Sequence, residues 1–136
     1  MSYLLDTDIC IALIDGTSGK VRTRFAEAVR RRAGIATSTI VVHQLWHRAA
    51  KNELATRYAR ALTAFLSSDI AVLDYTERDA QAAGEIRAEL ERQGQRIGEY
   101  DTLIAGQAFS RNLVLVTANT REFGRVKGLI VEDWTV

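Results

Sequence analysis

Two carboxylates stand at the end of the first apolar stretch of the chain. The run "YLL" at residues 3–5 has the character of a buried strand, and Asp6 and Asp8 follow it with one residue between them. A third acid, Asp101, opens the apolar helical segment "IGEYDTLIAGQAF". Two carboxylates about 4 Å apart repel by roughly 4 kcal/mol at an effective dielectric near 20, so converging acids either stay partly protonated or bind a cation. Taken singly, Asp101 also fits a complement to a helix dipole, and Asp8 fits the cap of a helix that starts at Ile9.

The available ligand types indicate which cation such acids would hold. Oxygen ligands suit Mg²⁺ or Mn²⁺, whereas zinc prefers cysteine and histidine. The lone Cys10 lies among aliphatic residues, where a small buried filler is the expected role. His43 and His47 are four residues apart on a helical segment, but no HExxH pattern or third ligand accompanies them, so we expect packing and surface roles.

Short apolar segments alternate with longer segments of helical period, which predicts an α/β fold with a mostly parallel central sheet flanked by helices. The expected strands are "YLL", "GIATS", "IAVLDY", "LVLVT" and "LIVEDW", and the expected helices cover 19–32, 40–50, 53–67, 76–93 and 99–111. The helix at 76–93 has an approximate capping box formed by Thr76 and Asp79.

The predicted strand ends are where a ligand site is expected, because open parallel sheets bind ligands beyond the carboxyl ends of their strands. The first strand brings Asp6 and Asp8 to this edge, and the strand "LVLVT" brings Thr117 and Asn119. These four residues, together with Asp101, therefore form the candidate site.

Length and composition indicate one ordinary globular domain over residues 1–136. Apolar residues make up 47% of the chain and charged residues 26%, which excludes a disordered tail. No apolar stretch is long enough to span a bilayer, and the amino terminus lacks the pattern of a signal peptide, so we expect no membrane contact and a cytoplasmic location.

Charge is distributed unevenly along the chain. Residues 20–60 carry ten basic and two acidic side chains, whereas the rest of the chain is net acidic, although the total is only +1. Arginine supplies most of the bases, and its planar fork suits phosphate. A solvated helix face explains many such clusters. An acidic site beside a basic surface equally suggests a phosphate-backbone partner.

Four stretches closely resemble the PIN-domain ribonuclease toxins of bacterial toxin–antitoxin pairs, of the VapC type. They are "LLDTDICIALI", "STIVVHQLWHRAAK", "IRAELERQGQRIGEYDTLIAGQAFSRNLVLVTANTREF" and "LIVEDW", and together they run from end to end of the chain. The resemblance implies a three-layer PIN-like domain and a Mg²⁺- or Mn²⁺-dependent endoribonuclease that acts on structured RNA such as tRNA.

The resemblance also implies the roles of individual residues. The catalytic positions would be Asp6, Gln44, Asp101 and Asn119, with Asp6 and Asp101 as the principal metal ligands. Asp8, Thr117 and Glu122 would orient ligands or waters around them. Asn119 stands where many relatives have aspartate, and Gln44 stands where the family has glutamate.

Gln44 is the main departure from the family pattern. Glutamine keeps the length and one carbonyl oxygen of glutamate, but it removes a negative charge and adds a donor. We therefore expect looser metal binding and slower cleavage than in a Gln44→Glu variant. Two accounts of this residue stay open: a naturally attenuated copy, or an engineered change that silences a toxin harmful to its host.

The expected partners follow from the same resemblance. They are an antitoxin of the VapB type, an RNA substrate and a second copy of the chain in a homodimer. The arginines expected to track an RNA backbone are Arg22, Arg24, Arg30, Arg31, Arg32, Arg48 and Arg57.

Apolar and aromatic residues of the segments 40–50 and 53–67 are candidates for contacts with the antitoxin or the second copy. They are Leu45, Trp46, Tyr58, Leu62 and Phe65. Core packing is the alternative for each, and it is preferred for Leu62 and Phe65.

Two other functions remain as alternatives. A catalytically dead chain would act only by binding an antitoxin or RNA. The motif "DTD" also fits the opening of phosphatases with an aspartate nucleophile, but these enzymes need a downstream lysine, and none is suitably placed among Lys20, Lys51 and Lys127.

Overall fold

The computed structural model describes residues 2–136, which form a single five-stranded sheet and seven helices. The strands are β1 (Ser2–Leu5), β2 (Gly34–Ser38), β3 (Ala71–Leu73), β4 (Val114–Val116) and β5 (Val131–Glu132). The helices are α1 (Thr7–Asp15), α2 (Gly19–Arg30), α3 (Thr39–Lys51), α4 (Ala55–Leu66), α5 (Glu77–Arg92), α6 (Glu99–Ser110) and α7 (Thr120–Phe123). None of these helices has the length and apolar character that crossing a bilayer requires.

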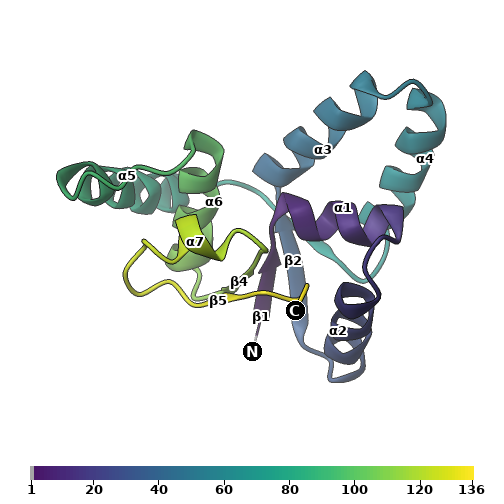
Figure 1. Cartoon of the computed structure of the whole chain (residues 1–136), viewed down its shortest axis with the longest axis horizontal. Helices are drawn as coiled ribbons and strands as arrows, with labels where there is room; N and C mark the ends of the chain where they lie inside the picture. Colours follow the sequence, from purple (N-terminus) through teal and green to yellow (C-terminus); the bar gives the residue numbers. More distant parts are fainter. Residues whose placement is uncertain (1) are drawn as a thin grey trace.

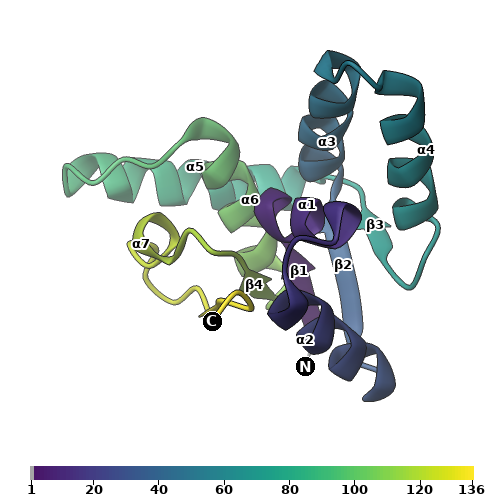
Figure 2. The ribbon, with the colours of Figure 1, turned by 45° about the vertical axis from the view of Figure 1, so that its right-hand side comes forward.

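The sheet has the strand order β3-β2-β1-β4-β5, and all four pairings are parallel. From β1 the chain moves to one side through β2 and β3, and it then returns to the other side through β4 and β5. Because parallel crossovers are right-handed, this reversal places α1–α4 on one face and α5–α6 on the other. Figures 1 and 2 show the two groups of helices on opposite sides of the strands. The predicted α/β fold with helices on both faces is confirmed.

Most predicted elements are present within two or three residues of their expected ends. The capping box of α5 forms as expected, since Thr76 Oγ1 accepts from the Asp79 N–H and Asp79 Oδ2 accepts from the Thr76 N–H. The expected helix start at Ile9 is wrong. α1 begins at Thr7, so Asp6 occupies the cap position and Asp8 lies inside the first turn. The short helix α7 was not predicted.

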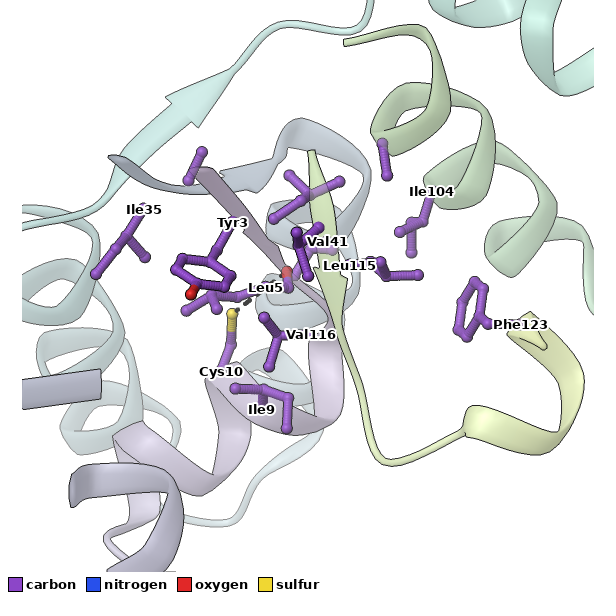
Figure 3. Packing of buried hydrophobic residues seen from close by; sticks show 14 of the residues in the cluster. Tyr3, Leu5, Ile9, Cys10, Ile35, Val41, Ile104, Leu115, Val116 and Phe123 are labelled. Atoms are coloured by element: carbon purple, nitrogen blue, oxygen red, sulfur yellow. Dashed lines mark hydrogen bonds between the residues drawn. The ribbon is translucent and has the colours of Figure 1, made fainter. Parts of the chain in front are cut away.

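The core lies on both faces of β1 and β4, the central strands. Leu4, Leu5, Leu115 and Val116 are buried, and Figure 3 shows aliphatic side chains from α1, α3 and α6 packed around these strands. Cys10 is buried in this core, and burial raises the pKa of its thiol to about 12, so it acts as the expected apolar filler.

The helices α5 and α6 approach each other closely. A Cβ atom on Gly106 of α6 would lie 2.6 Å from the backbone nitrogen of Ala83 of α5, so only glycine fits there. Close to this contact, buried Asp79 accepts hydrogen bonds from Arg111 and Ser110. We call these three residues the α5–α6 clasp. It fixes α6, which carries Asp101 in its first turn.

Candidate active site at the carboxyl edge of the sheet

β1 and β4 are adjacent strands that lead to different faces of the sheet, and the candidate site lies where both end. Asp6 directly follows β1 and Thr117 directly follows β4. The Thr117 hydroxyl donates to Asp6 Oδ2 at 2.8 Å and accepts from the Asn119 N–H at 3.0 Å. Although Asp6 occupies the cap position of α1, its side chain does not cap the helix. The carboxylate is instead oriented by the neighbouring strand.

Asp8 connects α1 to the loop after β4. Its Oδ1 accepts from the Ile9 N–H at 2.8 Å, and its Oδ2 accepts from the Ala118 N–H at 2.9 Å and from the Thr117 hydroxyl at 3.5 Å. Both oxygens therefore have protein donors. The geometry suits a residue that holds the β4 loop against α1.

Asn119 joins the second pair of acids. Its side-chain amide donates to Glu122 Oε2 at 2.8 Å and to Asp101 Oδ2 at 3.4 Å. The first turn of α6 supplies Asp101, while Asn119 and Glu122 come from the cap and first turn of α7. A chain of contacts thus runs from Asp6 through Thr117 and Asn119 to Asp101, and it unites three distant parts of the sequence.

The acids of this edge resist ionisation. Burial raises the pKa of Asp6 to about 6, and the charge of Asp8 adds to the shift. Burial also raises the pKa of Asp101 to about 7, assisted by the charge of Asp6 and by the hydrogen bond with Glu122. The pKa of Asp8 is likewise raised, mainly by burial. The pKa of Glu122 alone is lowered, first by the hydrogen bond from Asn119 and then by that from Asp101.

These acids lack a cationic partner. Among residues 2–136, no Lys or Arg side chain forms an ion pair with Asp6, Asp8 or Asp101. A divalent ion fits this donor set, because hard cations bind carboxylate and amide oxygens. The described residues contain no ready-made cage of three His, Cys, Asp or Glu side chains. Mg²⁺ tolerates such an arrangement, since it usually keeps several water ligands.

Gln44 lies in the second turn of α3 and contacts the first residue of α1. Its Oε1 accepts a hydrogen bond of 2.5 Å from the hydroxyl of Thr7, the residue that follows Asp6. A glutamate at this position would accept the same hydrogen bond, so a Gln44→Glu change preserves the contact while it adds charge. Sequence reasoning missed Thr7, because nothing in the motif "DTD" marks the central threonine as the partner of α3.

The predicted arginines occupy several different places. Arg48 pairs with Asp15 at 3.2 Å and lies over the ring of Tyr58, which joins α1, α3 and α4. Arg57 is exposed on α4. The others belong to α2 or to the turn that follows it, and this turn precedes the amino end of β2, at the edge of the sheet opposite the acids. They are Arg22, Arg24, Arg30, Arg31 and Arg32. The structure therefore does not gather these arginines around the acidic site.

Most of the residues that were expected to contact partners belong to the core or pack against it. Leu45 and Leu62 are fully buried, and Tyr58 and Phe65 pack against the core. Trp46 remains 41% exposed on α3. His43 and His47 are exposed, and His43 Nε2 lies 3.3 Å from the hydroxyl of Tyr100 on α6. The expected surface role of the two histidines is consistent with this placement.

An apolar hollow lies away from the acids. About 320 Å³ in volume, it lies between α5 and α6 and is lined mainly by Ala83, Leu90, Ile97 and Leu103. Its walls carry none of the four acids discussed above. The chemistry of the side chains, rather than the depth of the surface, identifies the carboxyl edge as the candidate site.

Comparisons with known proteins agree on the fold and on the kind of protein that shares it. The PIN domain family model matches residues 3–129. The chain is 42% identical to a tRNA(fMet)-specific endonuclease VapC of Shigella flexneri, over 99% of both chains. It is 38% identical to the ribonuclease VapC2 of Haemophilus influenzae, over 98% of both chains.

Solved structures extend this similarity to three dimensions. The structure superposes on one chain of the VapBC2 complex of Rickettsia felis bound to a promoter DNA fragment, with a TM-score of 0.92, 34% identity and coverage of 98% of this chain and 99% of that chain. It also superposes on the DNA-bound VapBC complex of Salmonella typhimurium, with a TM-score of 0.90, 40% identity and coverage of 98% of each chain.

Proposed function

The chain belongs to the PIN-domain family, among the VapC ribonuclease toxins that pair with VapB antitoxins, and from this premise we propose that it is a Mg²⁺-dependent endoribonuclease attenuated by Gln44. The observation that carries the proposal is the group of buried and half-buried acids without ion-pair partners at the carboxyl ends of β1 and β4. Burial and the neighbouring acids raise the pKa values of Asp6 and Asp101, and a divalent ion would stabilise their ionised forms.

Asp6 and Asp101 are the proposed ligands of the ion. Thr117 orients Asp6 through its hydroxyl, and Asn119 orients Asp101 and Glu122 through its amide. Asp8 holds the β4 loop and adds negative charge beside Asp6. The chemistry that a bound divalent ion supplies is activation of water and neutralisation of phosphate charge. The residues of this chain orient the oxygen ligands and partly shield them from bulk water, and a bound cation would favour their ionised form.

Gln44 weakens the site through its charge rather than through its shape. It contacts Thr7 next to Asp6, so a negative charge at this position would strengthen the attraction for a cation. Substitution of a residue that hydrogen-bonds near a metal ligand typically changes metal affinity or activity by about 10-fold to 100-fold. We expect a similar gain when Gln44 is replaced by glutamate.

The proposed substrate is a folded RNA of the tRNA class, which the name of the Shigella flexneri relative suggests. The proposed partners are a VapB-type antitoxin and a second copy of the chain. Exposed apolar side chains on and beside α3 and α4 offer a surface for one of them, since Trp46 is 41% and Leu54 60% exposed. Aromatic side chains of this kind are enriched at protein interfaces.

The experiment that tests the function compares cleavage of a tRNA transcript by three proteins, in Mg²⁺ and in a chelator. They are the unmodified chain, Gln44→Glu, and Gln44→Glu combined with Asp101→Asn. We expect slow cleavage by the first, cleavage at least about tenfold faster by the second, and none by the third.

The chelator should abolish all cleavage. Absence of Mg²⁺-dependent cleavage by Gln44→Glu would contradict the nuclease assignment and leave a chain that acts only by binding. Equal rates for the first two proteins would remove Gln44 from the functional residues.

A further inference from the structure

The exposed side of α2 carries a row of cations that the acidic site does not use. Lys20, Arg24 and Arg31 are separated by four and seven residues, which places them on one side of the helix. Arg30 and Arg32 extend this positive charge at the carboxyl end of α2. The row from Lys20 to Arg31 is about 16 Å long, a length over which one strand of a nucleic acid duplex presents four or five phosphates.

Two open hollows run along this row and meet at Arg24. The first, about 660 Å³ in volume, is lined by Tyr3, by the acids Glu27 and Glu132, and by the arginines at 24, 30 and 31. The second, about 430 Å³, is lined by Lys20, Arg24 and Val136. Figure 1 shows the carboxyl-terminal segment crossing in front of β1 and ending near α2. We call the two hollows together the α2 trough.

The cations of the trough outnumber its acids, and most of them have no ion-pair partner among the described residues. Arg24 pairs with Glu132 at 3.2 Å and lies over the ring of Trp134. Within residues 2–136, no carboxylate forms an ion pair with Lys20, Arg30, Arg31 or Arg32.

Two aromatic side chains, Tyr3 and Trp134, lie beside the trough and hold Arg31 in place. Arg31 donates a hydrogen bond to the hydroxyl of Tyr3 at 3.4 Å, and the Tyr3 ring packs edge-on against Trp134. Arginines held by aromatic and hydroxyl groups present their forks to phosphate with less loss of side-chain entropy.

The end of the trough at Arg30 and Arg31 is separated from the acids by the length of a strand. Arg30 and Arg31 precede the amino end of β2, whereas Asp6 follows the carboxyl end of β1, which pairs with β2 in register. The five residues of β2 span about 16 Å. A short oligonucleotide at the acidic site therefore does not reach Arg30 and Arg31, but a folded RNA does.

We propose that the α2 trough is a second contact surface for the RNA substrate, which binds the phosphate backbone away from the site of cleavage. This inference rests on the proposed RNA substrate and adds a reason why a folded RNA is bound in preference to a short one. The trough is an open, charged surface rather than a deep pocket. It would therefore recognise the phosphate backbone and the shape of the RNA, and it would not read individual bases.

The test measures binding of the full chain to a labelled tRNA transcript and to a tetranucleotide, over a range of salt concentrations and in a chelator so that no RNA is cut. Arg30→Ala combined with Arg31→Ala removes two cations from the trough. Arg87→Ala combined with Arg92→Ala removes the same charge from the exposed face of α5 and serves as the matched control. Thermal unfolding of each variant establishes that it is folded.

We expect the trough variant to bind the tRNA about tenfold more weakly and to lower the slope of log affinity against log salt by about 1.5, with binding of the tetranucleotide unchanged. The control variant should stay close to the unmodified chain. Arg30→Lys combined with Arg31→Lys, which keeps the charge, should restore most of the affinity.

Equal losses in the trough and control variants would overturn the inference while the proposed function stands. Failure of every protein to bind tRNA would instead overturn the proposed substrate. If the trough variant loses affinity for duplex DNA but not for RNA, the surface is a DNA-binding site and the assignment to RNA is wrong.

Discussion

Asp79 and Asp6 are both buried aspartates, yet their environments move their pKa values in opposite directions. Burial opposes the ionisation of Asp79, but hydrogen bonds from Arg111, Ser110 and Thr76 outweigh it and hold its pKa well below the usual range. Burial and the charge of Asp8 raise the pKa of Asp6 to about 6, and the hydrogen bonds from the Thr7 backbone and the Thr117 hydroxyl do not offset this rise.

This difference distinguishes Asp79, an acid with a structural role, from Asp6, an acid whose charge has no cationic partner within the described residues. The chain supplies Asp79 with its own cation, because Arg111 pairs with it at 2.9 Å. It supplies Asp6 and Asp101 with orientation but no cation. Buried charge without a partner is costly, and sites of function are where proteins retain it.

The largest expected effect comes from removing the cation of the α5–α6 clasp. Arg111→Ala leaves Asp79 buried and unpaired, so we expect the free energy of unfolding to fall by about 3–5 kcal/mol, measured by urea denaturation. Arg92→Ala serves as the control, since its pair with Glu89 is exposed and should contribute little to stability. A loss at Arg111 no larger than that at Arg92 would show that the contrast between the two regions is wrong.

The pH dependence of stability should have a distinct sign for each region. The pKa of Asp6 is about 6 in the folded chain and near 4 when unfolded, so the folded state binds more protons between these values. Stability therefore falls as pH rises through this window, and Asp101 extends the fall to about pH 7. The lowered pKa of Asp79 acts in the opposite sense, and its stabilisation is lost only as pH falls below about 4.

In the absence of divalent ions, we expect the free energy of unfolding to be about 2 kcal/mol higher at about pH 5 than at about pH 8. Asp6→Asn combined with Asp101→Asn should flatten the profile across this range. A stability that rises from pH 5 to pH 8 in the unmodified chain would contradict the assignment of the raised pKa values.

A smaller effect is expected from the hydroxyl that orients Asp6. Thr117→Val removes the hydrogen bond to Asp6 Oδ2 at nearly constant volume, so we expect a loss of about 1 kcal/mol in the free energy of unfolding. Metal affinity, measured by calorimetry, should fall about tenfold or more, because the ligand loses its orienting partner. Thr117→Ser keeps the hydroxyl and should retain the affinity; equal losses in both variants would exclude an orienting role.

The sequence predicted the fold and the meeting of the acids well, because both depend on local patterns. Alternating apolar segments indicated the parallel sheet, and the rule that ligands bind at the carboxyl ends of strands indicated the edge where Asp6, Thr117 and Asn119 lie together. The start of α1 was displaced because Asp8 is as good a cap residue as Asp6, and the sequence does not show that the helical backbone begins at Thr7.

Features that depend on the path of the chain in space could not be predicted from sequence patterns. Gln44 meets Thr7 across two elements, and the position of the arginines around α2 depends on the direction in which that helix returns to β2. The charge count at residues 20–60 was correct, but it did not reveal that most of these arginines lie away from the acids. The α5–α6 clasp was also missed, because Asp79 had already been assigned to a capping box.

The most direct test of the central claim is titration of the chain with Mn²⁺ and Mg²⁺ by calorimetry at about pH 6.5, in buffers of different ionisation enthalpy. We expect ion binding to release about one proton per chain, Gln44→Glu to bind the ion more tightly, and Asp6→Asn combined with Asp101→Asn to abolish binding. Ion binding that survives the double substitution, or its absence even in Gln44→Glu, would contradict the claim that these acids are held ready for a divalent ion.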